Sequence, residues 1–314
     1  MRIVFCGDTF PSAPLLLRER LRPGDEIVTT DVGELRTSGT SADVVIPLMS
    51  RVDAAAMEAA RCRLVQQFGT GLEGVDLDFA RRQGIWVANV PSTGSNAASV
   101  AEHAILLILS LLRQMNVAQK SVRARVIGAP LGRMLAGRTV CLYGLGHTAL
   151  AAAPRLRAFD VRLIGITRDP SAAKVADYRL DACYAVRDRA EALGQTDILV
   201  LCTRLCEETR GIIDAAALEA LPAGALVINT ARAGLVDYRA LRTALESGHL
   251  SGAGLDVFWE EPIAPDDPIL SLANVVATPH VAGVTEESYE EIAGAVSANI
   301  ERLRRGEPPL NRIA

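Results

Sequence analysis

Three polar residues in the second half of the chain, Arg232, Glu261 and His280, have side chains that suit the reduction of a keto acid. An arginine guanidinium can bind the carboxylate and the carbonyl oxygen of such a substrate together. A histidine titrates near neutral pH, so it can donate a proton to the carbonyl oxygen as a hydride arrives at the carbon. A carboxylate beside it favours the imidazolium form and orients the ring. We therefore predict Arg232 as the substrate-binding and polarising residue, His280 as the general acid and base, and Glu261 as its partner.

Each of these three residues follows a short apolar run that is typical of a buried strand. The runs are Ala225–Asn229, Gly252–Val257 and Asn274–Ala277. Ligands of open α/β sheets bind outside the carboxyl ends of the strands, so we expect the three side chains to converge on one crevice. A single arginine, glutamate or histidine after a strand is usually structural. The shared placement of all three is what favours catalysis.

A glycine-rich turn with the pattern G-x-G-x-x-A, Gly144–Ala149, lies between an expected strand and an expected helix. In dinucleotide-binding folds the first glycine makes the tight turn and the second lets the backbone approach a pyrophosphate. The helix that follows offers unpaired N–H groups to the phosphates. We therefore predict a dinucleotide cofactor bound by Gly144, Gly146, His147 and Thr148.

The end of the next expected strand bears on the choice between NAD and NADP. An acidic residue there normally accepts the ribose 2′-hydroxyl of NAD, but this chain has Thr167 followed by Arg168. A hydroxyl beside a guanidinium can accommodate a 2′-phosphate, which favours NADP. Two alternatives stay open: Arg168 lies along the adenine, or Asp169 takes the role of the acid.

The surrounding pattern predicts an α/β fold with two doubly wound parallel-sheet domains, Rossmann- or flavodoxin-like, and a cleft between them. The first ninety residues alternate apolar strand-like runs with helices, and Asp53–Ala60 and Asp76–Gln83 each open on an aspartate N-cap. A long helix is expected from Ser99 to about Ala118, opened by a capping box of Ser99 and Glu102. A second strand–helix series follows, and Glu286–Arg305 forms the last helix.

Composition and charge restrict the class of protein. The chain has 314 residues, of which 49% are hydrophobic and 4% aromatic, and its formal net charge is -4. This length fits two domains, and the lack of a basic block gives no indication of nucleic acid or an anionic membrane as a partner. The longest apolar run, Ala104–Leu112, is shorter than the ~20 residues that a membrane span needs.

The six cysteines and the start of the chain bear on location and metal content. The cysteines are scattered, and the close pair Cys202 and Cys206 lacks a second cysteine or histidine pair that would complete a zinc site. The chain opens directly on an expected strand, so we expect no signal peptide. We predict a cytoplasmic protein without a metal.

The chain resembles the D-isomer-specific 2-hydroxyacid dehydrogenases, in particular the glyoxylate and hydroxypyruvate reductases, over nearly its whole length. The motifs that carry the resemblance are Gln67–Gly71 with Gly74–Asp76, Ser95–His103, Gly144–Gly146, Asn229–Asp237, Leu255–Phe258, Glu261–Pro262 and Thr278–His280.

This resemblance implies roles for residues and for segments of the chain. It agrees with the roles given above to Arg232, Glu261 and His280, and adds Asp256 as a contact of the nicotinamide carboxamide. It implies that Gly69, Thr70 and Gly71 cradle the substrate carboxylate. It further implies a discontinuous substrate domain, residues 1–98 and 286–314, a cofactor domain, residues 99–285, and a homodimer built around the helix from Ser99.

The chain departs from the family pattern at three positions. Ala149 replaces the third glycine of the cofactor loop, Thr167 replaces the acid, and Arg204 stands where the family usually has a proline. Glu261 argues against formate dehydrogenases, which pair glutamine with the histidine. The absence of a domain after Ala314 argues against the long, serine-regulated phosphoglycerate dehydrogenases.

The main hypothesis is therefore an NAD(P)-dependent reductase of a small 2-keto acid that forms the D-2-hydroxy acid. Oxidation of phosphoglycerate or phosphite is the alternative within the same class, because related triads serve those reactions. From another class, a dinucleotide-sensing scaffold such as the C-terminal-binding protein corepressors stays open, because those proteins keep the triad.

Overall fold

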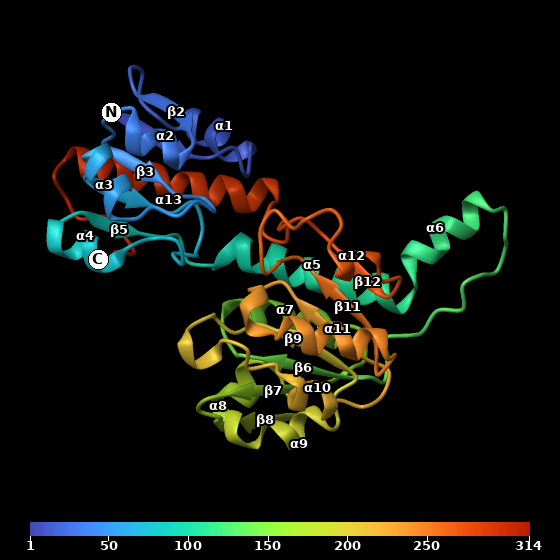
Figure 1. Cartoon of the computed structure of the whole chain (residues 1–314). Helices are drawn as coiled ribbons and strands as arrows, with labels where there is room; N and C mark the ends of the chain where they lie inside the picture. The colour runs from blue at the N-terminus through green and yellow to red at the C-terminus, as the bar shows by residue number, and fades with distance from the viewer. The chain divides into compact units, whose positions relative to one another are not determined.

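A computed structural model describes residues 1–314, and the chain divides into two compact units (Figure 1). Unit 1 comprises Met1–Asn96 and Thr285–Ala314, and unit 2 comprises Ala97–Val284. Each unit is built on one parallel sheet with its own buried apolar core. The predicted fold class, two parallel-sheet α/β domains, is confirmed.

Unit 1 has a five-stranded sheet in the order β2-β1-β3-β4-β5. Its strands are β1 (Arg2–Cys6), β2 (Glu26–Thr30), β3 (Val44–Ile46), β4 (Leu64–Gln66) and β5 (Trp86–Ala88). Its helices are α1 (Ser12–Arg18), α2 (Val32–Thr37), α3 (Ala54–Ala60), α4 (Leu77–Gln83) and α13 (Glu286–Arg304). The two predicted aspartate caps are present: Asp53 accepts from the N–H of Ala56, and Asp76 from that of Phe79.

Unit 2 has a seven-stranded sheet in the order β12-β11-β10-β9-β6-β7-β8. Its strands are β6 (Thr139–Tyr143), β7 (Arg162–Thr167), β8 (Ala182–Ala185), β9 (Ile198–Leu201), β10 (Ala225–Asn229), β11 (Leu250–Leu255) and β12 (Val275–Ala277). Its helices are α6 (Met115–Arg123), α7 (His147–Arg157), α8 (Ala172–Asp177), α9 (Arg189–Leu193), α10 (Ala215–Glu219), α11 (Tyr238–Glu246) and α12 (Pro268–Ser271), with short 3-10 turns at Val186–Asp188, Glu207–Thr209 and Ala233–Leu235.

The strand order of unit 2 determines where its ligand crevice lies. From β6 the chain builds outward through β7 to β8, and then returns to lay β9 against the other side of β6. The connections leave in opposite directions on the two sides of this point, and open α/β sheets bind ligands at the carboxyl ends of the strands at such a switch point.

Helix α5 (Gly94–Leu112) corrects one prediction. It begins five residues before the predicted capping box, and Ser99 lies inside it and is buried. The carboxylate of Glu291 accepts from the N–H of Ser95 at 2.8 Å, so a distant residue takes the role that was assigned to a local cap. The helix ends at Leu112, and Gln114, with φ of 50°, separates it from α6.

Helix α5 is also long and apolar enough to cross a membrane, the one helix of the chain that is. Nine of its residues are buried, and most of them pack in the core of unit 2. A core helix passes the same test of length and composition, so this helix alone is weak grounds for a membrane span.

Candidate active site

His280 and Glu261 form a hydrogen-bonded pair on the loops that follow β12 and β11. The Nδ1 atom of His280 lies 2.7 Å from Oε2 of Glu261, and the other carboxylate oxygen accepts from the N–H of Phe258 at 2.8 Å. The two side chains are 25% and 17% exposed. The glutamate is thus held by its own loop and in turn orients an imidazole that solvent or a small molecule can reach.

The electrostatics of this pair place Arg232 in the same neighbourhood. Burial opposes ionisation of the Glu261 carboxyl, but the hydrogen bond and charge of His280, the N–H of Phe258 and the positive charge of Arg232 outweigh it. The pKa of Glu261 is therefore below its ordinary value. The three residues predicted for catalysis are brought together within unit 2.

Arg232 sits on a short connection whose backbone is tightly held. The side chain of Asn229, fully buried at the end of β10, donates to the carbonyl of Arg232 at 2.9 Å and accepts from the N–H of Ala231 at 3.0 Å. The guanidinium Nη1 donates to the carbonyl of Ala231 at 2.7 Å. These bonds fix the direction in which the arginine leaves the sheet.

The glycine turn after β6 has the geometry that a dinucleotide phosphate needs. Gly144 has φ of 97°, and a Cβ there would lie 2.7 Å from the backbone nitrogen of Thr203, in the loop after β9. Gly146 is the N-cap of α7, no side chain caps this helix, and a Cβ on Gly146 would meet nothing within 4 Å. His147 and Thr148 open the helix, so its first N–H groups face open space where an anion can bind. These residues fit a pyrophosphate.

The end of β7 has a positively charged neighbour in addition to the predicted Arg168. Lys174, in α8, donates to the hydroxyl of Thr167 at 3.2 Å and to the carbonyl of Asp169 at 2.8 Å. The pKa of the exposed Glu208 carboxyl is lowered, first by a hydrogen bond from Cys206 and to a smaller extent by the charges of Arg168 and Arg204.

Lys174 thus adds a cation at the end of β7, beside the predicted Arg168, and sequence reasoning missed it. Its position three residues after the serine N-cap of α8 was the available signal.

Asp256, which was predicted as a nicotinamide contact, is hydrogen-bonded within the protein. It directly follows β11, is fully buried, and its carboxylate accepts from the hydroxyl of Thr278 at 2.6 Å and from the N–H groups of Val281 and Ala282 at 2.9 and 2.8 Å. All of these donors belong to the loop that carries His280.

The predicted substrate loop, Gly69–Gly71, lies in unit 1. Its carbonyls are engaged: that of Gly69 by the N–H of Val90, that of Thr70 by Asn89 and that of Gly71 by Gln67. Gly69 has φ of 136°, which a residue with a side chain rarely adopts. With the carbonyls turned to the protein, the N–H groups of the loop are left for another acceptor.

Two further histidines have partners of their own. His249 bonds to the carbonyl of Leu218 and supports α10, whereas His103 reaches Thr278, beside the candidate site. No group of three or more histidine, cysteine, aspartate or glutamate side chains is arranged to hold a metal ion.

Comparisons with known proteins agree with this geometry. Residues 105–282 match the family model described as D-isomer specific 2-hydroxyacid dehydrogenase, NAD binding domain. A glyoxylate reductase of Korarchaeum cryptofilum is 33% identical over 282 residues, a match that covers 86% of this chain and 82% of the relative. A D-3-phosphoglycerate dehydrogenase of Archaeoglobus fulgidus is 32% identical over 273 residues, and the match covers 86% of this chain but 51% of the relative. The chain thus spans about half the length of that second relative.

Among solved structures, one similar protein is an NADPH-dependent glyoxylate/hydroxypyruvate reductase of Sinorhizobium meliloti in complex with NADP and malonate. The TM-score is 0.84 and the sequence identity 31%, over 100% of this chain and 96% of the other. Since the matched NAD-binding domain also takes up more than half of the chain, the chain belongs to the D-isomer specific 2-hydroxyacid dehydrogenases, a family of NAD(P)-dependent oxidoreductases.

Proposed function

We propose that this protein reduces a small 2-keto acid of the glyoxylate or hydroxypyruvate type to the D-2-hydroxy acid. The observation that carries the proposal is the pair of His280 and Glu261, 2.7 Å apart, with the charge of Arg232 acting on the same carboxylate. A proton donor and a carboxylate-binding guanidinium beside a dinucleotide turn are the groups that this reduction requires.

In the proposed reaction, His280, Arg232 and Glu261 of unit 2 each have a separate role. A bound reduced nicotinamide supplies the hydride to the substrate carbon. Because Nδ1 of His280 is engaged by Glu261, proton donation to the carbonyl oxygen runs through Nε2. Arg232 binds the substrate carboxylate and stabilises the charge that develops on the carbonyl oxygen. The ionised Glu261 holds the imidazole in orientation and favours its protonated form.

We assign Gly69, Thr70 and Gly71 as the cradle of the substrate carboxylate. Three N–H groups on a loop whose carbonyls are bonded to Val90, Asn89 and Gln67 form an anion-binding concavity. Exchange of Gly69 for alanine, at φ of 136°, is expected to raise KM for the keto acid with little change in cofactor affinity.

The test of the reaction is consumption of NADPH and of NADH against glyoxylate, hydroxypyruvate, pyruvate and phenylpyruvate, with oxidation of 3-phosphoglycerate and phosphite assayed in reverse. Turnover of a keto acid supports the proposal. Turnover confined to 3-phosphoglycerate would move the assignment to the activity named for the Archaeoglobus relative. Cofactor binding without turnover of any of these would favour the dinucleotide-sensing scaffold.

For the cofactor we propose a preference for NADP, with Arg168 and Lys174 binding the 2′-phosphate beside Thr167. The support is the hydrogen bond of Lys174 to the Thr167 hydroxyl and the absence of an acid at that position. Arg168→Ala is expected to weaken NADPH binding about tenfold or more and NADH binding less than twofold. Arg81, an exposed arginine of α4 in unit 1, provides the matched control as Arg81→Ala. Equal losses for both cofactors would refute the pairing with the 2′-phosphate.

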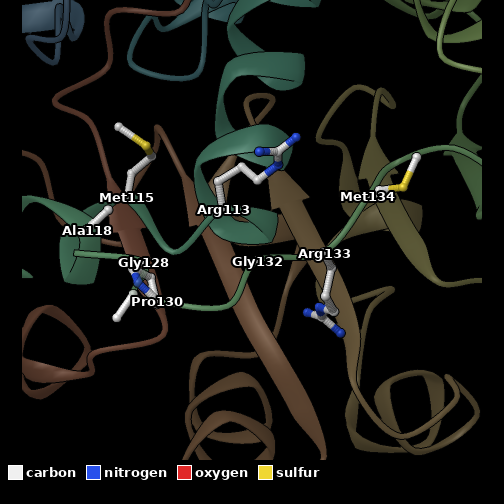
Figure 2. Close-up of a pocket in the computed structure, with 9 residues that line it drawn as sticks. Arg113, Met115, Ala118, Gly128, Pro130, Gly132, Arg133 and Met134 are labelled. Carbon is white, nitrogen blue, oxygen red and sulfur yellow. The ribbon is translucent and has the colours of Figure 1, made fainter.

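We further propose a homodimer formed through the arm that comprises α6 and residues 124–134. In Figure 1 this arm projects from the sheet of unit 2, and α6 has no buried residue. Ile127 is 99% and Leu131 90% exposed, which a monomer would leave in water. The arm also borders a shallow hollow of about 630 Å³, lined among others by Arg113, Met115 and Pro130 (Figure 2).

We propose a second copy of the chain as the partner of this arm. If each copy placed its arm on the other, the exposed apolar side chains of both arms would be covered at once. Sedimentation of the double variant Ile127→Asp with Leu131→Asp should show a monomer. Leu15→Asp, an exposed leucine in unit 1, is the control that should leave the mass unchanged. A monomeric unmodified protein would contradict the proposal.

We place the protein in the cytoplasm. All six cysteines are unpaired, and burial raises the pKa of Cys6, Cys62, Cys141 and Cys202 to about 12, so these thiols stay protonated and serve as small apolar side chains.

A further inference from the structure

His280 has a backbone conformation that needs external support. Its φ is 54°, in the left-handed region that residues with a side chain rarely adopt. Such a conformation is strained and persists only when the surroundings impose it. The N–H of His280 donates to the carbonyl of Asp256 at 2.9 Å and to that of Thr278 at 3.0 Å. The residue that carries the proton is thus tied to the chain directly after β11.

The side chain of Asp256 holds the residues on the far side of His280. Its Oδ1 accepts from the N–H of Val281 at 2.9 Å and its Oδ2 from the N–H of Ala282 at 2.8 Å. Both the backbone and the side chain of one fully buried residue therefore act on three consecutive loop residues, 280–282. A carboxylate in this setting is stabilised by its donors, and loss of one donor weakens its hold on the others.

A third donor brings a second histidine into the arrangement. The hydroxyl of Thr278 lies 2.6 Å from Oδ1 of Asp256 and 2.9 Å from Nε2 of His103 on helix α5. An ionised carboxylate can only accept, so the single hydroxyl proton goes to Asp256. The hydroxyl oxygen then accepts, and Nε2 of His103 must carry a hydrogen. The resulting chain runs in one direction, from His103 through Thr278 to Asp256.

We propose that His103, Thr278 and Asp256 form a chain of positioning residues that holds His280 in its left-handed conformation, so that its imidazole meets Glu261. The inference rests on the proposed acid and base role of His280 and extends it to residues that act through the backbone of the loop that carries His280. His103 acts from α5 through the hydroxyl of Thr278, and its Nε2 also lies 3.5 Å from Oδ1 of Asp256.

The decisive variants are Thr278→Val, which keeps the shape of the side chain without the hydroxyl, and Thr278→Ser, which keeps the hydroxyl. A misplaced catalytic group lowers kcat, so Thr278→Val is expected to lower kcat about tenfold, with KM and the Kd for NADPH within about twofold. Thr278→Ser should recover most of the lost rate. His103→Leu should act in the same direction as Thr278→Val, and His103→Gln, which keeps an N–H donor, less.

A second readout does not depend on turnover. The Nδ1 proton that His280 shares with Glu261 gives a downfield proton resonance, assigned by its disappearance in His280→Ala. In Thr278→Val this resonance should broaden or shift in the protein without substrate, and in Thr278→Ser it should stay. If the unmodified protein reduces no keto acid, the proposed function fails while this resonance still tests the positioning chain.

Three results would overturn the positioning chain. The first is an unchanged resonance together with an unchanged kcat in Thr278→Val. The second is a loss of the same size in the serine and valine variants, which would point to packing of the side chain. The third is a change confined to KM or to the Kd of the cofactor, which would return Asp256 to a binding role.

Discussion

Asp25 in unit 1 and Glu261 in unit 2 are carboxylates with a similar set of partners and different uses. Asp25 accepts from the N-terminal amino group at 2.6 Å, from Arg304 at 2.8 and 2.7 Å and from the N–H of Arg22 at 3.1 Å. Glu261 accepts from His280 and from the N–H of Phe258. Both combine a cationic partner with a main-chain donor, and both have a pKa below the ordinary value.

The difference lies in the chemistry of the basic partner and in the exposure of the carboxylate. The guanidinium that holds Asp25 keeps its charge at every physiological pH, and the Asp25 side chain is 2% exposed. The partner of Glu261 is an imidazole, the side chain used most often as a general acid and base, and the Glu261 side chain is 17% exposed. A permanent ion pair with a buried carboxylate ties segments of unit 1 together, whereas the more exposed pair of Glu261 and His280 can pass a proton to a ligand. The first should therefore control stability and the second turnover.

The largest expected effect is on turnover in His280→Ala. Removal of a general acid typically costs 10²–10⁴-fold, so we expect kcat to fall about 10³-fold. The Kd for NADPH and the unfolding free energy should change little, because His280 is at the surface of its unit. Steady-state kinetics together with cofactor titration and urea unfolding test this. Unchanged turnover would remove the acid and base assignment, and a large loss of stability would erase the contrast with Asp25.

The next effect in size is the loss of stability in Asp25→Asn. Removal of a buried charge that holds an arginine and the amino terminus is expected to lower the unfolding free energy by about 2–3 kcal/mol, with kcat unchanged well below the unfolding temperature. Urea unfolding followed by circular dichroism measures the first, and the keto-acid assay measures the second. Loss of turnover in a folded Asp25→Asn would break the comparison.

The same variant sharpens the comparison through pH. Burial of Asp25 opposes ionisation, but the hydrogen bonds from Arg304, the amino terminus and Arg22 outweigh it and lower its pKa below the ordinary 3.8. A carboxyl with a lowered pKa stabilises the fold above its ordinary value, and this contribution is lost as the pH falls through the folded value. The difference in stability between the unmodified protein and Asp25→Asn should therefore be full near pH 6 and shrink below about pH 4.

Glu261→Gln should give a smaller effect, on rate and on its pH dependence. The amide keeps the shape but not the charge that favours the imidazolium, so kcat for reduction should fall about tenfold, which corresponds to about 1.4 kcal/mol. The pH optimum for reduction should move to lower values, because more acid is then needed to protonate the histidine. An unchanged pH profile would show that the charge of Glu261 does not act on the reaction.

The strands in the middle of the two sheets could be predicted from the sequence, because burial leaves a recognisable pattern of apolar residues. Strands in the middle of each sheet are buried on both faces and appear as continuous apolar runs, and β10 has the bounds predicted for it. The strands that were not predicted, β2, β5 and β8, lie at sheet edges and are partly exposed. Their burial is set by neighbours far away in sequence, which local periodicity does not record.

The candidate site also has a part that could be predicted from the sequence and a part that could not. Arg232, Glu261 and His280 could be predicted because each follows a recognisable strand in a parallel sheet. Contacts between distant segments could not. His103 precedes Thr278 by 175 residues, and Glu291 caps α5 from a helix almost 200 residues later in the chain. Such pairs come together through the topology of the sheets, and nothing in their local sequence marks them.

The smallest effect, in Arg304→Lys, separates geometry from charge in the buried pair. A single guanidinium nitrogen, Nη2 of Arg304, donates to both oxygens of Asp25. Lysine keeps the positive charge on a side chain that places its ammonium differently, so we expect a loss of about 1 kcal/mol in unfolding free energy. The acid sensitivity of Asp25 should remain, because a cation still faces it. A loss as large as that of Asp25→Asn would show that the position of the guanidinium nitrogen, rather than the charge alone, stabilises unit 1.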